Sequence, residues 1–125
     1  MNDRELLELA AKAAGILLVW DGDSPKEVTE HWSCDPTEPP HEREWDWNPL
    51  TDDGDALRLA VRLNLAVVLH PALNQAIVRP YHTRDMNREC REDCEKHTDH
   101  FAATRHAIVR AAAEIGRQMQ EGGAA

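Results

Sequence analysis

The stretch Trp45-Asp-Trp-Asn-Pro-Leu-Thr-Asp-Asp-Gly-Asp-Ala-Leu-Arg-Leu-Ala-Val61 decides how the chain divides into elements. Pro49 ends one element, because proline has no N–H to donate to a helix or sheet. Thr51 or Asp52 can then cap a new helix by accepting backbone N–H bonds at its start. This pattern predicts a helix from about Asp52 to Asn64. Its expected apolar stripe comprises Leu57, Ala60, Val61 and Asn64, widened by Leu59 and Leu63.

Apolar patterns on either side of this stretch predict two further helices. Residues 2–14 carry an apolar stripe at helical spacing, and Gly15 suits a helix C-cap because glycine tolerates the left-handed conformation. Residues 99–120 predict a last helix, and residues 121–125 are expected to form a disordered tail. The apolar face expected for the last helix comprises Phe101, Thr104, Ile108, Ala112, Ile115 and Met119.

Two apolar runs of strand length, Ile16 to Asp21 and Leu65 to His70, predict strands that are buried on both faces. Each run is followed by turn residues and a second short run, at 26–32 and 75–79. Each pair of runs therefore predicts a hairpin.

Two segments show no apolar periodicity. The proline-rich residues 33–44 predict a loop, and the charged residues 85–97 predict either a solvated helix or an ordered loop. The resulting order is helix, hairpin, helix, hairpin, helix. It predicts a single α+β domain over residues 1–120, with an antiparallel-containing sheet (two hairpins) packed with three helices.

Composition indicates a soluble folded domain. The chain has 125 residues, of which 42 % are hydrophobic, enough for one modest core. No apolar run approaches the ~18–20 residues that a membrane span requires. The first residues lack the basic region and cleavage site of a signal peptide. Three cysteines, an odd number, are typical of reduced thiols, so we expect a cytoplasmic protein.

Acidic side chains are concentrated in one third of the chain. Residues 21–55 hold twelve acidic side chains against Lys26 and Arg43, a net charge of −10 within a total of −9. Phosphate contacts need Lys or Arg, so this region is not expected to bind nucleic acid directly. It either forms a solvated surface or attracts a basic protein partner. The candidate partner-binding residues are Asp35, Glu38, Glu42, Glu44 and Asp46, together with Trp45 and Trp47.

The two tryptophans of this set have alternate spacing, so an extended segment would place Trp45 and Trp47 on one face. Two interpretations stay open. Either both side chains fill the core beside the capped helix, or they anchor a partner in an interface.

Cysteine and histidine residues crowd residues 90–100. In a helix, Cys90, Cys94 and His97 would lie near one face, with His100 following, and thiolate and imidazole are zinc ligands. One straight helix separates positions 90 and 97 by ~10 Å, so a break or a further ligand from His31 or Cys34 would be needed. The alternative is that the cysteines pack as small apolar side chains.

Arg84, Arg88 and Arg91 also follow helical spacing. Guanidinium groups pair bidentately with phosphate, so this row could hold a nucleotide-like small molecule. The alternative is a solvated helix face whose arginines pair with neighbouring carboxylates. The sequence has neither a Gly-x-Ser-x-Gly elbow nor a glycine-rich phosphate loop, so we expect a protein that is not an enzyme.

The Trp-Asn-Pro-Leu entry at residues 47–50, followed by Asp55-Ala-Leu-Arg-Leu-Ala-Val61, resembles a family of small phage-encoded proteins that share the phage ABA sandwich domain. The segment Ala103 to Gly116 is similar to the closing helix of that group. These segments cover about a quarter of the chain.

The resemblance implies a phage origin. Together with the small single domain, the absent catalytic motifs and the concentrated acidity, it predicts a phage accessory protein that acts by binding in the cytoplasm of the host cell. Its expected action is to inhibit or redirect a host protein during host takeover or counter-defence, through the acidic surface. One alternative is a sponge for a nucleotide-like defence signal, which would favour a homo-oligomer because such sites usually lie between subunits. Another is a small zinc-binding protein or metal-dependent enzyme.

Overall fold

The computed structural model describes residues 1–31, 34–81 and 89–123. Its longer helices are α1 (Asp3–Ala14), α2 (Asp53–Arg62) and α3 (His100–Gly123). The strands are β1 (Leu17–Asp21), β2 (Ser24–His31), β3 (His41–Asp46), β4 (Leu65–His70), β5 (Gln75–Pro80) and β6 (Cys90–Asp93). The described residues also form the short 3-10 helices η1 (Pro71–Leu73) and η3 (Cys94–Lys96).

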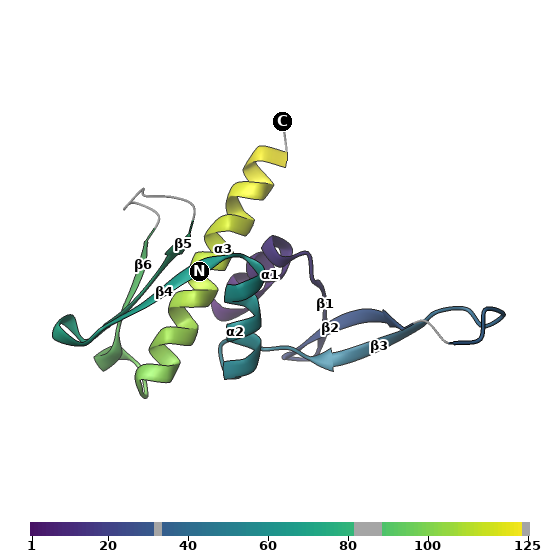
Figure 1. Cartoon of the computed structure of the whole chain (residues 1–125), viewed down its shortest axis with the longest axis horizontal. Helices are drawn as coiled ribbons and strands as arrows, with labels where there is room; N and C mark the ends of the chain where they lie inside the picture. Colours follow the sequence, from purple (N-terminus) through teal and green to yellow (C-terminus); the bar gives the residue numbers. More distant parts are fainter. Residues whose placement is uncertain (32–33, 82–88, 124–125) are drawn as a thin grey trace.

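The strands form two three-stranded antiparallel sheets, in the orders β1-β2-β3 and β4-β5-β6. Each sheet follows a helix in the chain, and α3 closes the fold. The predicted α+β class is confirmed. Figure 1 shows the second sheet lying along α3, whereas the first sheet extends away from the helices as an arm.

Each sheet has one strand more than the predicted hairpin. β3 begins at His41, inside the segment predicted as a loop, and β6 lies inside the segment predicted as a helix or loop. β3 is fully exposed, and only alternate residues of β6 are buried. Neither strand therefore needs to be apolar along its length. An apolar pattern therefore could not reveal either strand.

Small residues let α1 and α3 pack closely. The buried face of α1 contains Ala10 and Ala11, and it meets an alanine-rich stretch of α3. A Cβ placed on Gly116 would lie 2.0 Å from the backbone oxygen of Leu9, so no other side chain fits there. This close contact between the first and last helices is the centre of the core.

α3 is buried around much of its middle rather than along one stripe. Ile108 is 5 % exposed, as predicted, but Phe101 and Met119 near the helix ends are 66 % and 47 % exposed. The single predicted stripe was therefore wrong at its ends. The physical reason is that α1, α2 and the second sheet all pack on α3. The helix also continues through Gly123, beyond its expected end at residue 120.

The caps of α1 and α2 follow local sequence signals. Gly15 ends α1 with a φ of 71°, as predicted. Asp52 caps α2, because its Oδ2 accepts the backbone N–H of Asp55 at 2.8 Å. Thr51 does not share this role, since its hydroxyl donates to the backbone oxygen of Asn48 at 3.4 Å.

The predicted buried face of α2 was right at Leu59 and Ala60 but wrong at Leu57 and Val61. Leu57 and Val61 are 64 % and 71 % exposed, whereas Leu59 is 2 % exposed. The carboxylate of Asp55 turns inward to accept the backbone N–H of Asn48 at 3.0 Å. This contact places the Asp55 side chain on the buried side of α2, which the apolar pattern could not show.

β1 and β4 were predicted to be buried on both faces, and the structure contradicts this. Leu17 of β1 is 63 % exposed and Leu69 of β4 is 60 % exposed. Both are edge strands, whereas the central β5 of the second sheet buries Ala76 and Val78 completely. Among the described residues, no helix is both long and apolar enough to cross a membrane.

Candidate functional site

Glu92 is an acidic residue buried between the second sheet and α3. β6 has alternating burial, so Cys90 and Glu92 face α3 while Arg91 faces outward. Glu92 is only 9 % exposed. A carboxylate can be buried in this way only when hydrogen bonds replace its lost water.

Three side chains supply those hydrogen bonds. His97 Nε2 lies 3.0 Å from Glu92 Oε2, and His106 Nδ1 lies 2.9 Å from Oε1. Arg110 Nη1 also donates to Oε1. His106 and Arg110 are one turn apart on α3, so both reach the same carboxylate. The extended residue His97 follows η3, which brings the chain back over Glu92.

These contacts fix the protonation state of Glu92. Burial by itself would raise the pKa of this carboxyl, but the hydrogen bonds from His97, Arg110 and His106 outweigh burial and lower the pKa to about 2. The His97 and His106 rings also lie close together, with 5.0 Å between their centroids. The result is an anionic carboxylate held between two imidazoles and a guanidinium.

The metal-ligand set predicted from the sequence is not brought together. Among the described residues, the one group with ligand atoms close enough to share a metal ion is Glu92, His97 and His106. Cys90 and Cys94 are buried separately, and burial raises the pKa of the Cys90 thiol. Residues 90–93 form a strand rather than a helix. The helical spacing assumed for the predicted ligands therefore does not exist, and Cys90, Cys94, His97 and His100 do not share a face.

Of the predicted set, only His97 belongs to the observed cluster. His100 is exposed at the start of α3. The sequence signal for the missing members was weak, since Glu92 is one acid among many and His106 is far along the chain. Recognising residues 90–93 as a strand would have placed Glu92 on the buried face beside Cys90.

The predicted arginine row is described only in part. Arg84 and Arg88 lie outside the described residues. Arg91 is exposed on β6, in a strand rather than a helix, and its Nη2 donates to Glu89 at 2.9 Å. Binding of a nucleotide-like small molecule stays a prediction.

The register of the first sheet places several carboxylates on one face of the arm. Glu30 lies directly opposite Glu42, Val28 opposite Glu44, and Lys26 opposite Asp46. Opposed residues share a face of a sheet, so we call Glu30, Glu42, Glu44 and Asp46 the acidic face. All four are exposed. The Lys26 ammonium pairs with Asp46 at 3.1 Å, which leaves the outer part of the face to Glu30, Glu42 and Glu44.

The remaining predicted partner-binding residues lie elsewhere. Asp35 organises the turn at the tip of the arm, accepting the backbone N–H of Thr37 at 2.9 Å and its hydroxyl at 2.7 Å, and these bonds lower the pKa of Asp35. Glu38 is exposed in the same turn. Trp45 is 52 % exposed on the face opposite the acidic face, where its Nε1 donates to the Thr29 hydroxyl at 2.9 Å.

Trp47 is removed from the predicted partner-binding set by its burial. It is 4 % exposed and belongs to the core. The alternate spacing that placed Trp45 and Trp47 on one face fails because β3 ends at Asp46. Trp47 therefore fills the core, as in the first interpretation. Trp45 lies at the surface, as the second interpretation requires.

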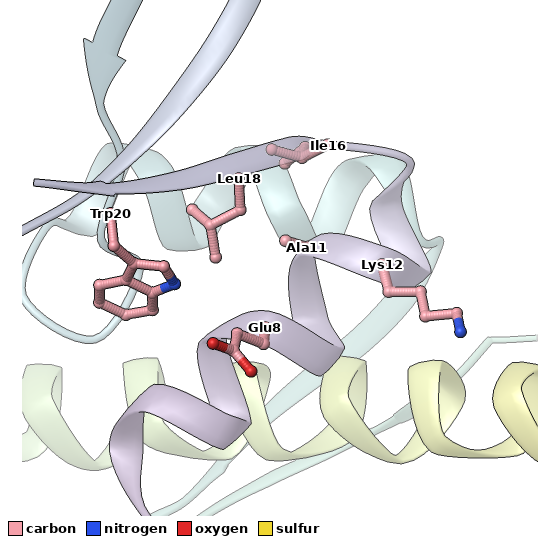
Figure 2. Close-up of a pocket in the computed structure, with 6 residues that line it drawn as sticks. All are labelled: Glu8, Ala11, Lys12, Ile16, Leu18 and Trp20. Atoms are coloured by element: carbon pink, nitrogen blue, oxygen red, sulfur yellow. The ribbon is translucent and has the colours of Figure 1, made fainter.

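Two of the grooves formed by the described residues lie against the helices. One, of about 380 Å³, lies between α1 and β1, and Figure 2 shows Leu18 and Trp20 reaching from β1 toward α1. The Arg4 guanidinium stacks on Trp20, 4.3 Å from the ring centroid. The other, of about 330 Å³, lies between α2, β4 and α3 and is lined by the exposed Leu57, Leu69 and Phe101.

Comparison with known proteins gives no match to a family model, to a curated protein or to a solved structure. The resemblance of residues 45–61 and 103–116 to the phage ABA sandwich family therefore stays a prediction. Two features stand out in the described residues: the acidic face, and the cluster of Glu92, His97, His106 and Arg110, which we call the Glu92 cluster.

Proposed function

We propose that this chain is a binding protein whose arm presents the acidic face to a basic partner protein. The observation that supports this most is the direct opposition of Glu30 and Glu42 in an exposed sheet. Like charges that face each other across two strands destabilise a sheet. A cationic partner seated on the face would convert that repulsion into attraction.

The arm also has the exposure that a partner requires. All six residues of β3 are exposed, and β3 is an edge strand of its sheet. Edge strands can accept a further strand through backbone hydrogen bonds. Contact with a partner can therefore combine charge pairing on the face with pairing along the edge.

The chemistry of the face points to Lys or Arg side chains rather than to a nucleic acid. Carboxylates repel phosphate, so the arm resembles nucleic acid in charge instead of binding it. Complementary charge chiefly raises the association rate, and salt weakens it. If the resemblance to phage proteins holds, the partner is a host protein, and the action is inhibition during host takeover or counter-defence.

A capture experiment with matched variants tests this proposal. The full chain is immobilised and exposed to host-cell lysate at low and high salt. The face variant carries Glu30→Gln, Glu42→Gln and Glu44→Gln. A control variant carries Glu5→Gln, Glu95→Gln and Glu121→Gln, three exposed carboxylates away from the arm that give the same change in net charge.

We expect the wild type and the control variant to capture the same basic protein in low salt, and the face variant to lose it. With the captured protein purified, the face variant should associate at least about tenfold more slowly. Equal loss of capture in the face and control variants would contradict the proposal, because it would show that only net charge matters. Equal retention would contradict it too, because the partner would then not need the carboxylates of the acidic face.

A further inference from the structure

The Glu92 cluster gathers metal-binding atoms from three separate parts of the chain. Glu92 comes from β6, His97 follows η3, and His106 lies on α3. One ligand atom from each of them lies within 4.8 Å of the other two. Their side chains are 11 %, 19 % and 28 % exposed, so the site is sheltered but not closed to solvent.

The donor set is one that transition metals prefer. Two imidazole nitrogens and one carboxylate oxygen are typical of zinc sites that keep a fourth position for water. Magnesium and calcium prefer all-oxygen sites, so they do not suit this cluster. The two nitrogens already point at the carboxylate, which means that the three donors converge without a change of fold.

We propose that Glu92, His97 and His106 bind a zinc ion, with His97 Nε2, His106 Nδ1 and a Glu92 carboxylate oxygen as ligands. Zinc takes the lone pair of a neutral imidazole, so each ring then carries its proton on the other nitrogen. The N–H groups that hold Glu92 in the metal-free protein are replaced by bonds to the metal. This site shares only His97 with the cysteine-based set that the sequence suggested.

Arg110 opposes metal binding at this site, and its replacement therefore provides a specific test. Its guanidinium donates to the same carboxylate, and a fixed positive charge beside the site repels a cation. The Arg110 side chain is 41 % exposed, so it can turn toward solvent when the metal enters. Removing this charge should therefore strengthen zinc binding, whereas a purely structural role for the cluster predicts no such gain.

Calorimetric titration of Zn²⁺ into the chelator-treated full chain tests the site. We expect one zinc ion per chain with a micromolar or tighter Kd. His97→Gln and His106→Gln should each weaken binding by at least about tenfold. Arg110→Gln should tighten it by about tenfold, and His100→Gln and Cys94→Ala should leave it unchanged. Mg²⁺ should not compete.

Two further measurements keep the result interpretable. Circular dichroism of each variant shows whether it is folded, and if one histidine variant is not, the other histidine variant and Arg110→Gln still decide the question. Co²⁺ in place of Zn²⁺ should give a spectrum without a thiolate charge-transfer band. Absence of stoichiometric zinc binding in the wild type would overturn the proposal. So would retained affinity in both histidine variants, loss of affinity in Cys94→Ala, or weaker binding in a folded Arg110→Gln variant.

Discussion

The two sheets of this protein have the same topology but differ in how deeply they are buried. Each is a three-stranded antiparallel meander that follows a helix. The central β5 of the second sheet has Ala76 and Val78 at 0 % exposure, whereas the central β2 of the first sheet leaves Val28 and Thr29 only half-buried. The difference arises because α3 covers the second sheet, while the first is tied to the helices mainly through β1. What a sheet packs against, not its topology, decides whether it serves stability or stays free for recognition.

The largest difference in unfolding free energy should come from replacing a carboxylate in each of the two sheets. Glu92→Ala should lower the free energy of unfolding by about 3 kcal/mol, because it leaves Arg110 and two histidines without their shared acceptor. Glu44→Ala on the arm should change it by less than about 0.5 kcal/mol. Urea unfolding with chelator present measures both. Equal effects would mean that the two sheets contribute alike to stability.

Acid should destabilise the protein by protonating Glu92 in the second sheet. The pKa of Glu92 is about 2 in the folded chain against an ordinary value of 4.5, so the unfolded chain binds this proton more readily. The stability it contributes is therefore complete above pH 4.5 and lost as the pH falls toward 2, at most about 3 kcal/mol.

The stability difference between the wild type and Glu92→Gln, followed by urea unfolding with chelator at decreasing pH, should shrink across that window. A constant difference would place the origin of the effect outside Glu92.

Valines in matched positions provide the third comparison. Val78→Ala in β5 should lower the free energy of unfolding by about 2 kcal/mol, since Val78 is fully buried. Val28→Ala in β2 should lower it by less than about 1 kcal/mol, because Val28 is only partly buried and lies opposite the exposed Glu44. Thermal unfolding of the two variants side by side measures the difference. A larger loss from Val28→Ala would reverse the ranking of the sheets.

α2 connects the two sheets in the chain, and its cap should contribute less than the core does. Asp52→Ala should lower the free energy of unfolding by about 1 kcal/mol through loss of the bond from the Asp55 N–H. Thr51→Ala is the control and should have little effect, since Thr51 does not cap the helix. If Thr51→Ala proved the more damaging change, the helix would begin one residue earlier than described.

The smallest effect should have the opposite sign. Glu30→Thr removes the like-charge pair with Glu42 and places a β-branched residue in an exposed strand, so it should stabilise the chain by about 0.5 kcal/mol. Part of this gain should disappear in high salt, because salt screens exposed charges. Chemical unfolding at two salt concentrations checks it. A destabilised variant would show that the carboxylate makes a favourable contact within the arm.

Local signals in the sequence predicted the parts of this fold that local chemistry determines. Gly15 was identified, and the cap of α2 was narrowed to Thr51 or Asp52, because a cap depends on residues within one turn. The inward position of Asp55 on α2 was missed because its contact with the backbone of Asn48 is specific to the folded turn. The burial of β1 and β4 was overestimated because an apolar run does not show whether a strand is central or at an edge.

The Glu92 cluster could not be predicted for a related reason. Its members are separated along the chain, and only the packing of β6 on α3 joins them. The acidic region was recognised from composition alone. Its division into a face, a turn and a buried tryptophan depended on the register of β2 with β3.

The close contact of Leu9 with Gly116 has a consequence for how the protein is made. The first helix finds its main packing partner in the last one, so the core cannot close until α3 has left the ribosome. Until then the apolar side chains of Leu6 and Leu7 have no cover from α3. Contacts between distant parts of a chain also form slowly. We therefore expect nascent chains that end before His100 to depend on chaperones, and folding to be completed in a late step, once α3 is available to pack on α1.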